Sequence, residues 1–313
     1  MFHVVGSAAY KEGLENTLAL DEHFCSPHKN YLTIHVAGTN GTGSCSSMLA
    51  SYLQTLGYRV GLYTSPHIYS FRERIRVNGE MIPEQEVVDF IENHRNFFEP
   101  LQPSFFELTT ALALKYFEKA SVDIAVIEVG LGGKLDCTNI IHPILSVITN
   151  IGLDHTALLG NSLAQIATQK AGIIKRGVPV VIGETTPETK TVFETEAANV
   201  GADIHFAEEE TSSVIVEEFF NLCELQGNYQ LPNIRTVLTA VKLFKSIGLR
   251  SDIELFKLSL QNITKNTGLM GRWQKIGNSP TTIIDTGQNE AGWLYVSQML
   301  AATQADCKKK GAK

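Results

Sequence analysis

Short apolar runs rich in valine and isoleucine alternate with longer stretches of helical periodicity along most of the chain. Near-continuous apolar runs of this kind are typical of parallel strands that are buried on both faces. The predicted strands are 31–37, 60–63, 124–129, 144–149 and 178–182, and the predicted helices include 46–55, 84–98, 106–119 and 163–174. This alternation predicts an α/β fold with a mostly parallel sheet covered by helices.

The pattern changes toward the end of the chain. Residues 184–221 alternate acidic and polar residues with shorter strand-like runs, and we assign them to the outer part of the same domain. The last segment predicts one strand, 281–285, and one helix, 291–302, which cannot enclose a core of their own. We therefore divide the chain into a large domain, residues 1–278, and the start of a second unit, residues 279–313. The apolar side chains of the last helix must pack on the first domain, meet a partner or stay exposed; they are Trp293, Tyr295, Val296, Met299 and Leu300.

Composition argues against a nucleic-acid-binding, disulfide-bonded or membrane-spanning protein. The chain has 313 residues, of which 43% are hydrophobic and 19% charged, and its formal net charge is -7. Because no basic stripe offsets that charge, nucleic-acid binding is not expected. Five cysteines without a C-x-x-C pair favour reduced thiols over disulfides or a zinc site; they are Cys25, Cys45, Cys137, Cys223 and Cys307. No apolar run approaches the roughly 18 residues of a membrane span, and the N-terminus lacks a signal-peptide core. We expect a cytoplasmic monomer without membrane contact.

A glycine-rich turn follows the first predicted strand. Residues 35–44 read HVAGTNGTGS and lead into a helix of small residues. Glycines at 38, 41 and 43 allow a tight turn whose successive N–H groups point at a phosphate, and the helix beginning near Ser44 adds its positive dipole end. The general P-loop pattern has a lysine at the position of Thr42 and a glycine at that of Val36. By itself the turn is either a nucleotide site or a plain connection between strand and helix.

Further motifs follow in order along the chain. They are AYK at 9–11, TSPH at 64–67, RERIRVNG at 72–79, EVGLGGKLD at 128–136, ITNIGLDH at 148–155, KAGI at 170–173, QGNYQ at 226–230 and GR at 271–272. With these motifs the chain resembles the folylpolyglutamate synthase and dihydrofolate synthase family of the Mur ligase superfamily, whose turn reads GTNGKGS. The resemblance runs from about residue 1 to residue 300.

The resemblance implies ATP-driven amide formation. ATP phosphorylates a carboxylate of a folate or dihydropteroate, and the amino group of L-glutamate then attacks the acyl phosphate. Such steps need metal ions and fixed donors around the phosphoryl group, and the cofactors implied are ATP and Mg²⁺. The resemblance also makes residues 1–278 a P-loop-like central ATPase domain. Residues 279–313 are then the first βα unit of a Rossmann-like C-terminal ligase domain, in a chain truncated at its C-terminus.

The family motifs also imply site residues, many of which follow predicted strands, at the edge where open α/β sheets bind ligands. The implied Mg²⁺ ligands are Ser65, Glu128 and His155, and the implied catalytic residues are Lys170 and His155. ATP contacts are implied for Gly38, Thr39, Asn40, Gly41, Thr42, Gly43, Ser44, Asn233, Arg272 and Asp285. Substrate contacts are implied for Thr64, Ser65, Pro66, His67 and Arg74. Lys170 matches the lysine that this superfamily commonly carbamylates to hold a second magnesium.

Several of these residues have a structural alternative. Ser65 precedes a proline and can cap a turn, Glu128 can be a buried carboxylate paired with a cation, and His155 can be a core histidine. Asn233 can simply cap a helix. Residues 65–78 form either a loop over the pterin or a β-hairpin with a solvated charged face.

Three positions depart from the family pattern. Thr42 replaces lysine, Gln169 replaces glutamate and Gln288 replaces histidine. Loss of one preorganised donor typically costs roughly 10²–10³-fold in rate, so these changes predict impaired ligation. The competing hypothesis is a non-catalytic remnant that binds nucleotide or folate weakly. A third is another Mur-type ligase acting on a peptidoglycan precursor, against which the motifs at 64–67 and 128–136 favour a folate.

Overall fold

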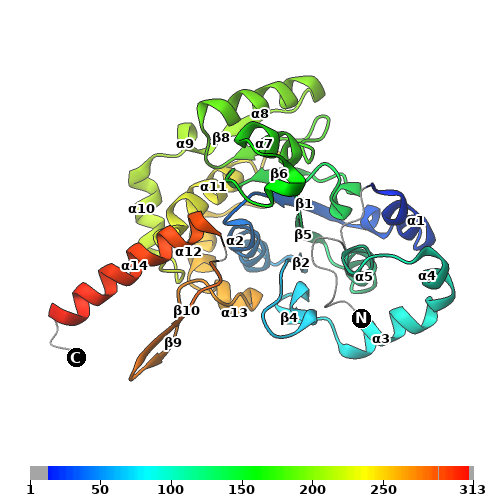
Figure 1. The fold of residues 1–313 in the computed structure, drawn as a ribbon, viewed down its shortest axis with the longest axis horizontal. Coiled ribbons are helices and arrows are strands. Elements are labelled where there is room, and N and C mark those ends of the chain that lie inside the picture. The colour runs from blue at the N-terminus through cyan, green and yellow to red at the C-terminus, as the bar shows by residue number, and fades with distance from the viewer. Residues whose placement is uncertain (1–12, 288, 310–313) are drawn as a thin grey trace.

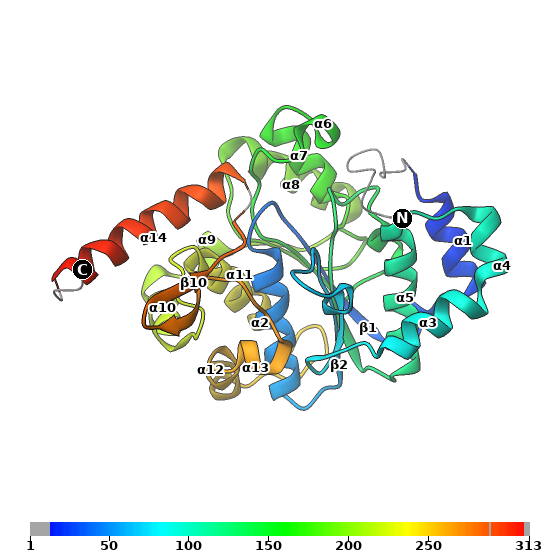
Figure 2. The same cartoon turned by 60° about the horizontal axis from the view of Figure 1, so that its bottom comes forward.

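The structure, a computed structural model, describes residues 13–287 and 289–309. The motif at 9–11 and Gln288 therefore lie outside the described residues. The chain folds as an eight-stranded sheet with helices on both faces, as Figures 1 and 2 show from two directions. The predicted α/β architecture is confirmed.

The sheet is parallel except at one edge. Its strand order is β4-β3-β2-β5-β1-β6-β7-β8, and only the pairs β2–β3 and β3–β4 are antiparallel. The strands are β1 (Leu32–Ala37), β2 (Val60–Tyr63), β3 (Ile75–Val77), β4 (Glu80–Met81), β5 (Ile124–Glu128), β6 (Leu145–Ile148), β7 (Val180–Ile182) and β8 (Ile204–Phe206). The central strands are buried on both faces, which explains their continuous valine and isoleucine runs. All five predicted strands are confirmed, with ends that differ by at most two residues.

Two sets of helices form the outer layers. One face is covered by α2 (Thr42–Thr55), α9 (Ala207–Glu210), α10 (Ser213–Leu222), α11 (Gln230–Lys242), α12 (Ile253–Leu260) and α13 (Ile263–Thr267). The other is covered by α1 (Glu15–His23), α3 (Glu84–Asn93), α4 (Arg95–Leu101), α5 (Phe105–Lys119), α7 (Leu163–Ala171) and α8 (Pro187–Val200). Short helical turns are η2 (Pro27–Asn30), η3 (Phe71–Arg74), η4 (Cys137–Ile140) and α6 (Thr156–Leu159). No helix in residues 13–287 and 289–309 has both the length and the apolar character needed to cross a membrane.

Two expectations about secondary structure were wrong in detail. The helix predicted over 84–98 is broken at His94, whose backbone φ is -117° and whose ring packs edge-on against Phe24, the residue after α1. Residues 184–221 hold one strand, β8, and are otherwise mostly helical. The signal for α8 was local, because Thr186 forms a capping box and Pro187 occupies the first helical position. Since β8 pairs with β7, this segment does belong to the main domain.

A buried carboxylate closes the turn that follows β5. Asp136 accepts hydrogen bonds from the backbone N–H groups of Gly130 (3.0 Å), Leu131 (2.8 Å) and Thr138 (2.9 Å), and from the Thr138 hydroxyl. Because that hydroxyl donates to Asp136, it accepts from Nε2 of His35, 2.8 Å away in β1. Burial lowers the pKa of His35 to about 3, so its ring is neutral. This network ties the turn to the centre of the sheet.

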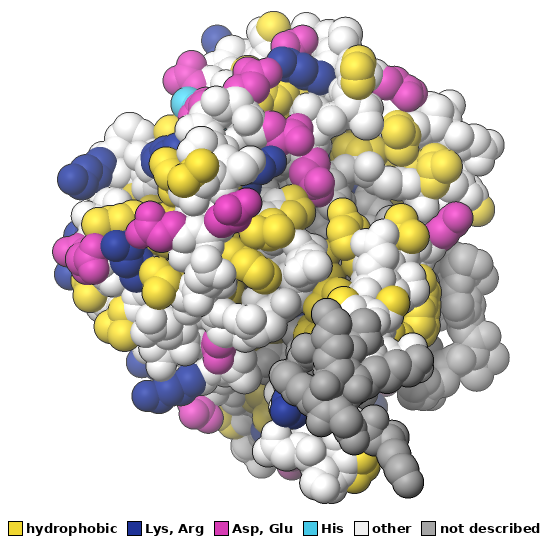
Figure 3. Space-filling view, turned by 90° about the vertical axis from the view of Figure 1, so that its left-hand side faces the viewer, with side chains coloured by type: hydrophobic (Ala, Val, Ile, Leu, Met, Phe, Trp, Pro, Cys, Tyr) yellow, Lys and Arg dark blue, Asp and Glu magenta, His cyan; other side chains and the backbone are white. Residues whose placement is uncertain are grey.

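The last elements stand apart from the sheet. β9 (Gln274–Asn278) and β10 (Thr281–Ile284) pair only with each other, and α14 (Glu290–Lys309) then runs outward on the side of α10 (Figures 1 and 2). Val296 and Met299 are buried, whereas Trp293 and Leu300 stay exposed. On the face of the molecule that lies on the left in Figure 1, hydrophobic side chains are interspersed with polar and charged ones (Figure 3). The boundary predicted at residue 278 falls in the turn between β9 and β10, and the two-domain division stays a prediction.

Candidate functional site

One cavity of about 700 Å³ lies at the carboxyl ends of the parallel strands. Its wall includes residues that follow β1 (39–44), β2 (64–68), β6 (150–152) and β7 (184–186), together with Glu128 at the end of β5. Parts of α11, residues 269–272 and residues 285–287 complete it. Its size suits a small molecule, and its place agrees with the rule for open α/β sheets.

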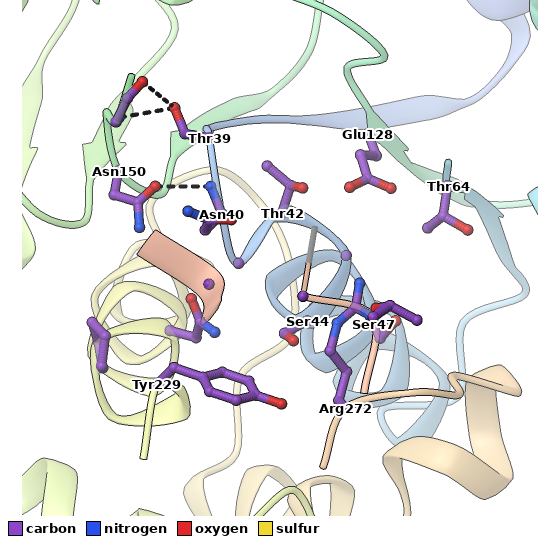
Figure 4. A pocket seen from close by; sticks show the side chains of 18 of the residues that line it. Thr39, Asn40, Thr42, Ser44, Ser47, Thr64, Glu128, Asn150, Tyr229 and Arg272 are labelled. Atoms are coloured by element: carbon purple, nitrogen blue, oxygen red, sulfur yellow. Dashed lines mark hydrogen bonds between the residues drawn. The ribbon is translucent and has the colours of Figure 1, made fainter. Parts of the chain in front are cut away.

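The glycine-rich turn forms the centre of this wall. Gly41 adopts a left-handed conformation (φ 84°), and α2 begins at the next residue. The N–H groups of Thr39 and Asn40 donate to the carbonyl (3.0 Å) and the side-chain oxygen (2.9 Å) of Asn150, which fixes one side of the turn (Figure 4). The first N–H groups of α2 have no acceptor within the helix. They form an anion-binding surface at the positive end of the helix dipole.

Glu128 lies beside the start of α2 and is only 3% exposed. The Ser65 backbone N–H donates to its Oε2 (2.9 Å). Burial raises the pKa of Glu128, while this bond, the nearby Thr42 hydroxyl and the charges of Arg272 and Arg74 oppose the rise. Thr42 stands at the position of the P-loop lysine (Figure 4). It therefore supplies a neutral hydroxyl where the lysine would supply a positive charge.

Arg272 supplies positive charge at the same end of the cavity. Its Nη2 lies 3.1 Å from where a Cβ on Gly43 would be, so a larger residue at 43 would displace the guanidinium. Its Nη1 donates to the Gly271 carbonyl (3.1 Å) and to the Thr286 hydroxyl. A fixed fork of N–H donors beside a helix N-terminus is well suited to phosphate oxygens.

Polar side chains of α11 form a hydrogen-bond network with the glycine-rich turn. Gln230 donates to the Ser44 hydroxyl (3.2 Å), and Asn233 donates to the side-chain oxygen of Gln230 (2.8 Å). Asn233 is the fourth residue of α11 and caps no helix, so the capping alternative is wrong. Asp285 accepts from the Tyr229 hydroxyl (2.6 Å) and the Trp273 N–H (2.8 Å). These bonds hold the start of α11 and the end of β10 together at the wall of the cavity.

The segment after β2 forms the opposite part of the wall. It runs as a loop over 64–70 into η3 and the β3–β4 hairpin, and contact of this loop with a pterin stays a prediction. Arg74 donates to Nδ1 of His67 (2.9 Å) and lies over the ring of Phe105. The charged face of the hairpin is not solvated, because Glu73 and Arg76 are buried. Thr64, Ser65, Pro66 and His67 line the cavity, and Arg74 stands behind His67.

Lys170 reaches the turn from the other face of the sheet. Its side chain is buried, and Nζ donates to the carbonyl of Gly38 (2.7 Å). Gly133 makes this placement possible, since a Cβ there would come within 2.7 Å of the Gln169 carbonyl oxygen. Burial lowers the pKa of Lys170 to about 8. A substantial part of the amine is therefore unprotonated at mildly alkaline pH.

This pKa makes stability depend on pH through Lys170. An exposed lysine in the unfolded chain has a pKa of about 10.4, so between pH 8 and that value the unfolded state binds more protons and stability rises with pH. We expect Lys170→Met to remove this rise, so that its unfolding free energy relative to the wild type falls by roughly 2–3 kcal/mol from pH 7.5 to 10.5. Urea unfolding at these pH values measures the difference. Lys245→Met, at an exposed position, should show no such change; a pH-independent difference for Lys170→Met would contradict the assignment.

Comparisons with known proteins decide what this site belongs to. Residues 36–274 match the Mur ligase middle domain family. The folylpolyglutamate synthase of Lacticaseibacillus casei is 36% identical over 296 residues, which are 85% of this chain and 67% of that protein. The chain belongs to the folylpolyglutamate synthase and dihydrofolate synthase family of Mur ligases. The dihydrofolate synthase/folylpolyglutamate synthase of Bacillus subtilis is 44% identical over 60% of this chain and 45% of its own length.

Solved structures of this family have the same fold. A complex of FPGS with AMPPCP and folate has a TM-score of 0.82 and 32% identity, over 92% of this chain and 75% of that one. The folylpolyglutamate synthase of Thermotoga maritima has a TM-score of 0.80 and 33% identity, over 92% and 70%. The chain spans 36% of a probable bifunctional folylpolyglutamate synthase/dihydropteroate synthase from Haloferax volcanii. It therefore covers from about a third to two thirds of the length of these three curated relatives.

The structure brings together most, but not all, of the residues that the family motifs imply. Ser65 and Glu128 are joined by a hydrogen bond, whereas the side chain of His155 is 55% exposed, caps α6 and does not line the cavity. No group of three or more His, Cys, Asp or Glu side chains in residues 13–287 and 289–309 could hold a metal ion. A cation here would have few protein ligands, as is common for Mg²⁺, which keeps several waters.

Sequence reasoning missed two acidic residues of the wall. Glu184 follows β7 and accepts a hydrogen bond from Asn150 (3.1 Å), and Glu208 lies just beyond β8. Both line the cavity. The signal was available, because each follows a strand at its carboxyl end. None of the motifs given above covers them, and both lie in the segment 184–221, which was assigned only to the outer part of the domain.

Proposed function

We propose that this chain binds Mg-ATP and activates a folate carboxylate for ligation to L-glutamate. One observation supports the proposal. Three groups lie at one end of the cavity: the free N–H groups of α2, the fixed guanidinium of Arg272 and the buried carboxylate of Glu128. In this proposal the γ-phosphoryl group of ATP passes to the acceptor carboxylate, which leaves ADP. The amine of glutamate then displaces phosphate and forms the amide. We place the reaction in the cytoplasm, in a monomer.

Each part of the site has a role in this scheme. The turn and Arg272 hold the phosphates, and Asn233 and Asp285 lie on the nucleoside side. Glu128 and the Ser65 hydroxyl are oxygen ligands for Mg²⁺, which would neutralise charge on the transferring phosphoryl group. His155 joins them only if the loop after β6 rearranges.

Residues 64–67 form the part of the cavity wall that contacts the acceptor folate. Lys170, with its lowered pKa, is available for carbamylation, because that modification needs an unprotonated amine.

A second candidate function is nucleotide or folate binding without ligation. It is favoured by one observation, the neutral hydroxyl of Thr42 near Glu128, where the P-loop pattern has a lysine. The loss of one charged donor weakens both ground-state and transition-state contacts to phosphate. The residues at 169 and 288 also differ from the family pattern.

Calorimetry with AMPPCP and Mg²⁺ separates these proposals from a fold without a working site. We expect the wild type to bind AMPPCP, and Thr42→Lys to bind it roughly 10–100-fold more tightly, because a charge-assisted hydrogen bond contributes about 1.5–3 kcal/mol. Thr55→Lys adds the same charge at the far end of α2 and should leave the affinity unchanged. No binding by either the wild type or Thr42→Lys would contradict the proposed function.

Product analysis then distinguishes the two candidates. The wild-type chain is incubated with ATP, Mg²⁺, a reduced folate and L-glutamate. ADP formation that requires both the folate and glutamate, together with a lengthened folate, would support ligation. Binding of AMPPCP without such turnover would favour the non-ligating candidate.

A further inference from the structure

Arg76, in the middle of β3, is a buried arginine without a partner. The residue is only 7% exposed, and its Nε has no hydrogen-bond acceptor. Among the described residues, no hydrogen bond to its guanidinium and no carboxylate within ion-pair distance is found. An arginine stays protonated in proteins, and burying an unpaired charge is unfavourable. Such a side chain is expected to have an anionic ligand.

The guanidinium is held against the cavity. Arg76 is part of the cavity wall, which also includes the apolar side chains of Ile68, Leu269 and Met270. Its Nε would lie 3.2 Å from a Cβ on Gly268, so that glycine gives the side chain its space. This part of the wall belongs to β3 and residues 268–270, whereas the anion-binding surface of α2 belongs to the β1–α2 turn. The cavity therefore offers positive charge in two places.

The nearby carboxylate does not serve as a partner for Arg76. Glu73 accepts hydrogen bonds from the backbone N–H groups of Ile68 (2.8 Å), Tyr69 (2.9 Å) and Ser70 (2.6 Å). It acts on Arg76 only through its charge. That charge also makes the surroundings of Arg76 unfavourable for a multiply charged phosphate. A singly charged carboxylate fits better.

The other two arginines of this segment are satisfied. Arg72 pairs with Glu84 (3.1 Å) and donates to the Ile82 carbonyl. Arg74 donates to His67 and lies over an aromatic ring. Arg76 thus differs from its neighbours in facing the cavity with its hydrogen-bonding groups unused.

We propose that Arg76 binds a second carboxylate of the acceptor and so selects an acceptor that ends in glutamate over one with a single carboxylate. The inference rests on the proposed function, in which one acceptor carboxylate must reach the phosphates at α2. That carboxylate cannot also occupy Arg76. A glutamyl end carries an α- and a γ-carboxylate, so one can react while the other is held. Pteroate has only the reacting group.

Binding of folic acid and pteroic acid to the full chain tests this selection, because the two differ by the glutamyl residue. Calorimetry is carried out with saturating Mg-AMPPCP. We expect the wild type to bind folic acid at least ~10-fold more tightly than pteroic acid, as one charge-assisted contact allows. Arg76→Met should reduce this ratio to about 1 by weakening folic acid alone, and Arg76→Lys should keep part of it. Arg72→Met, the matched control on the same segment, should leave the ratio unchanged.

The outcomes separate this inference from the proposed function. Equal weakening of both acids by Arg76→Met, an unchanged ratio, or a wild type that binds AMPPCP but neither acid would each overturn the role of Arg76 and leave ATP binding intact. Failure of the wild type to bind AMPPCP would overturn the proposed function, and the inference with it. AMPPCP affinity should be the same in Arg76→Met as in the wild type.

Thermal unfolding without ligand tests a purely structural role. Methionine keeps the apolar stem and removes an unpaired buried charge, so the Tm of Arg76→Met should equal or exceed that of the wild type. A lowered Tm together with an unchanged ratio of affinities would show that Arg76 stabilises the fold and selects nothing.

Discussion

Replacing Gly41 by alanine should reduce AMPPCP binding by at least ~100-fold. Gly41 has a φ of 84°, a conformation that costs other residues roughly 1–2 kcal/mol. In addition, a Cβ at this position would lie 2.0 Å from Oδ1 of Asn233. Asn233 cannot easily move away, because it is buried and bonded to Gln230. The turn must therefore shift, and the N–H groups at the start of α2 shift with it. Calorimetry with Mg-AMPPCP measures the loss.

Gly57, just beyond the other end of α2, provides a matched control. Its φ is 88°, and the nearest atom to an added Cβ is 3.9 Å away. Gly57→Ala should thus show the cost of the backbone conformation in its unfolding free energy but keep the wild-type affinity for AMPPCP. If Gly41→Ala binds AMPPCP as well as Gly57→Ala does, the turn is not the phosphate site.

Replacing Asp136 by alanine should destabilise the fold by about 4 kcal/mol, since each buried donor left without an acceptor costs about 1–3 kcal/mol. Four donors lose their acceptor at once: three backbone N–H groups and the Thr138 hydroxyl. For a chain of this size the Tm should fall by roughly 6 °C. Differential scanning calorimetry measures the change.

Asp89→Ala serves as the comparison for this variant. Asp89 is partly exposed and bonds only to Gln85 on the same helix, so its loss should change the unfolding free energy by at most about 0.5 kcal/mol. A Tm for Asp136→Ala within 2–3 °C of that of Asp89→Ala would mean that water replaces the carboxylate in the turn.

Much of the architecture could be predicted from the sequence, because the features that encode it are local. Buried parallel strands have continuous apolar runs, and the carboxyl ends of such strands locate the cavity. The glycines at 38–43 and the following helix predict a tight turn at this edge, but by themselves they do not distinguish a nucleotide site from a plain connection. The broken helix at His94 shows the limit, because the rings that pack against His94 include those of His23 and Phe24, which are far away in the chain.

The partners of individual side chains could not be predicted. The pattern S-x-x-E at 70–73 indicates one bond of Glu73, the capping box to the Ser70 N–H. Nothing local indicates its bonds to the N–H groups of Ile68 and Tyr69, or that Arg76 is left unpaired. The separation of His155 from Ser65 and Glu128 depends on the course of the loop after β6. A motif match identifies candidate site residues in the sequence, but the fold determines which of their side chains lie close together.

The cavity is also assembled in a fixed order during synthesis. Asn289 donates to the side chains of Asn40 (3.0 Å) and Asp154 (2.9 Å), and it follows Asn40 by 249 residues. At about 5–20 residues per second, a ribosome needs roughly 10–50 s to translate that distance. During most of that interval the turn can rely on Thr149, Asn150 and Gly152, which are translated much earlier than Asn289. The contacts that hold one side of the glycine-rich turn are thus available to the nascent chain before the residue that closes the other side.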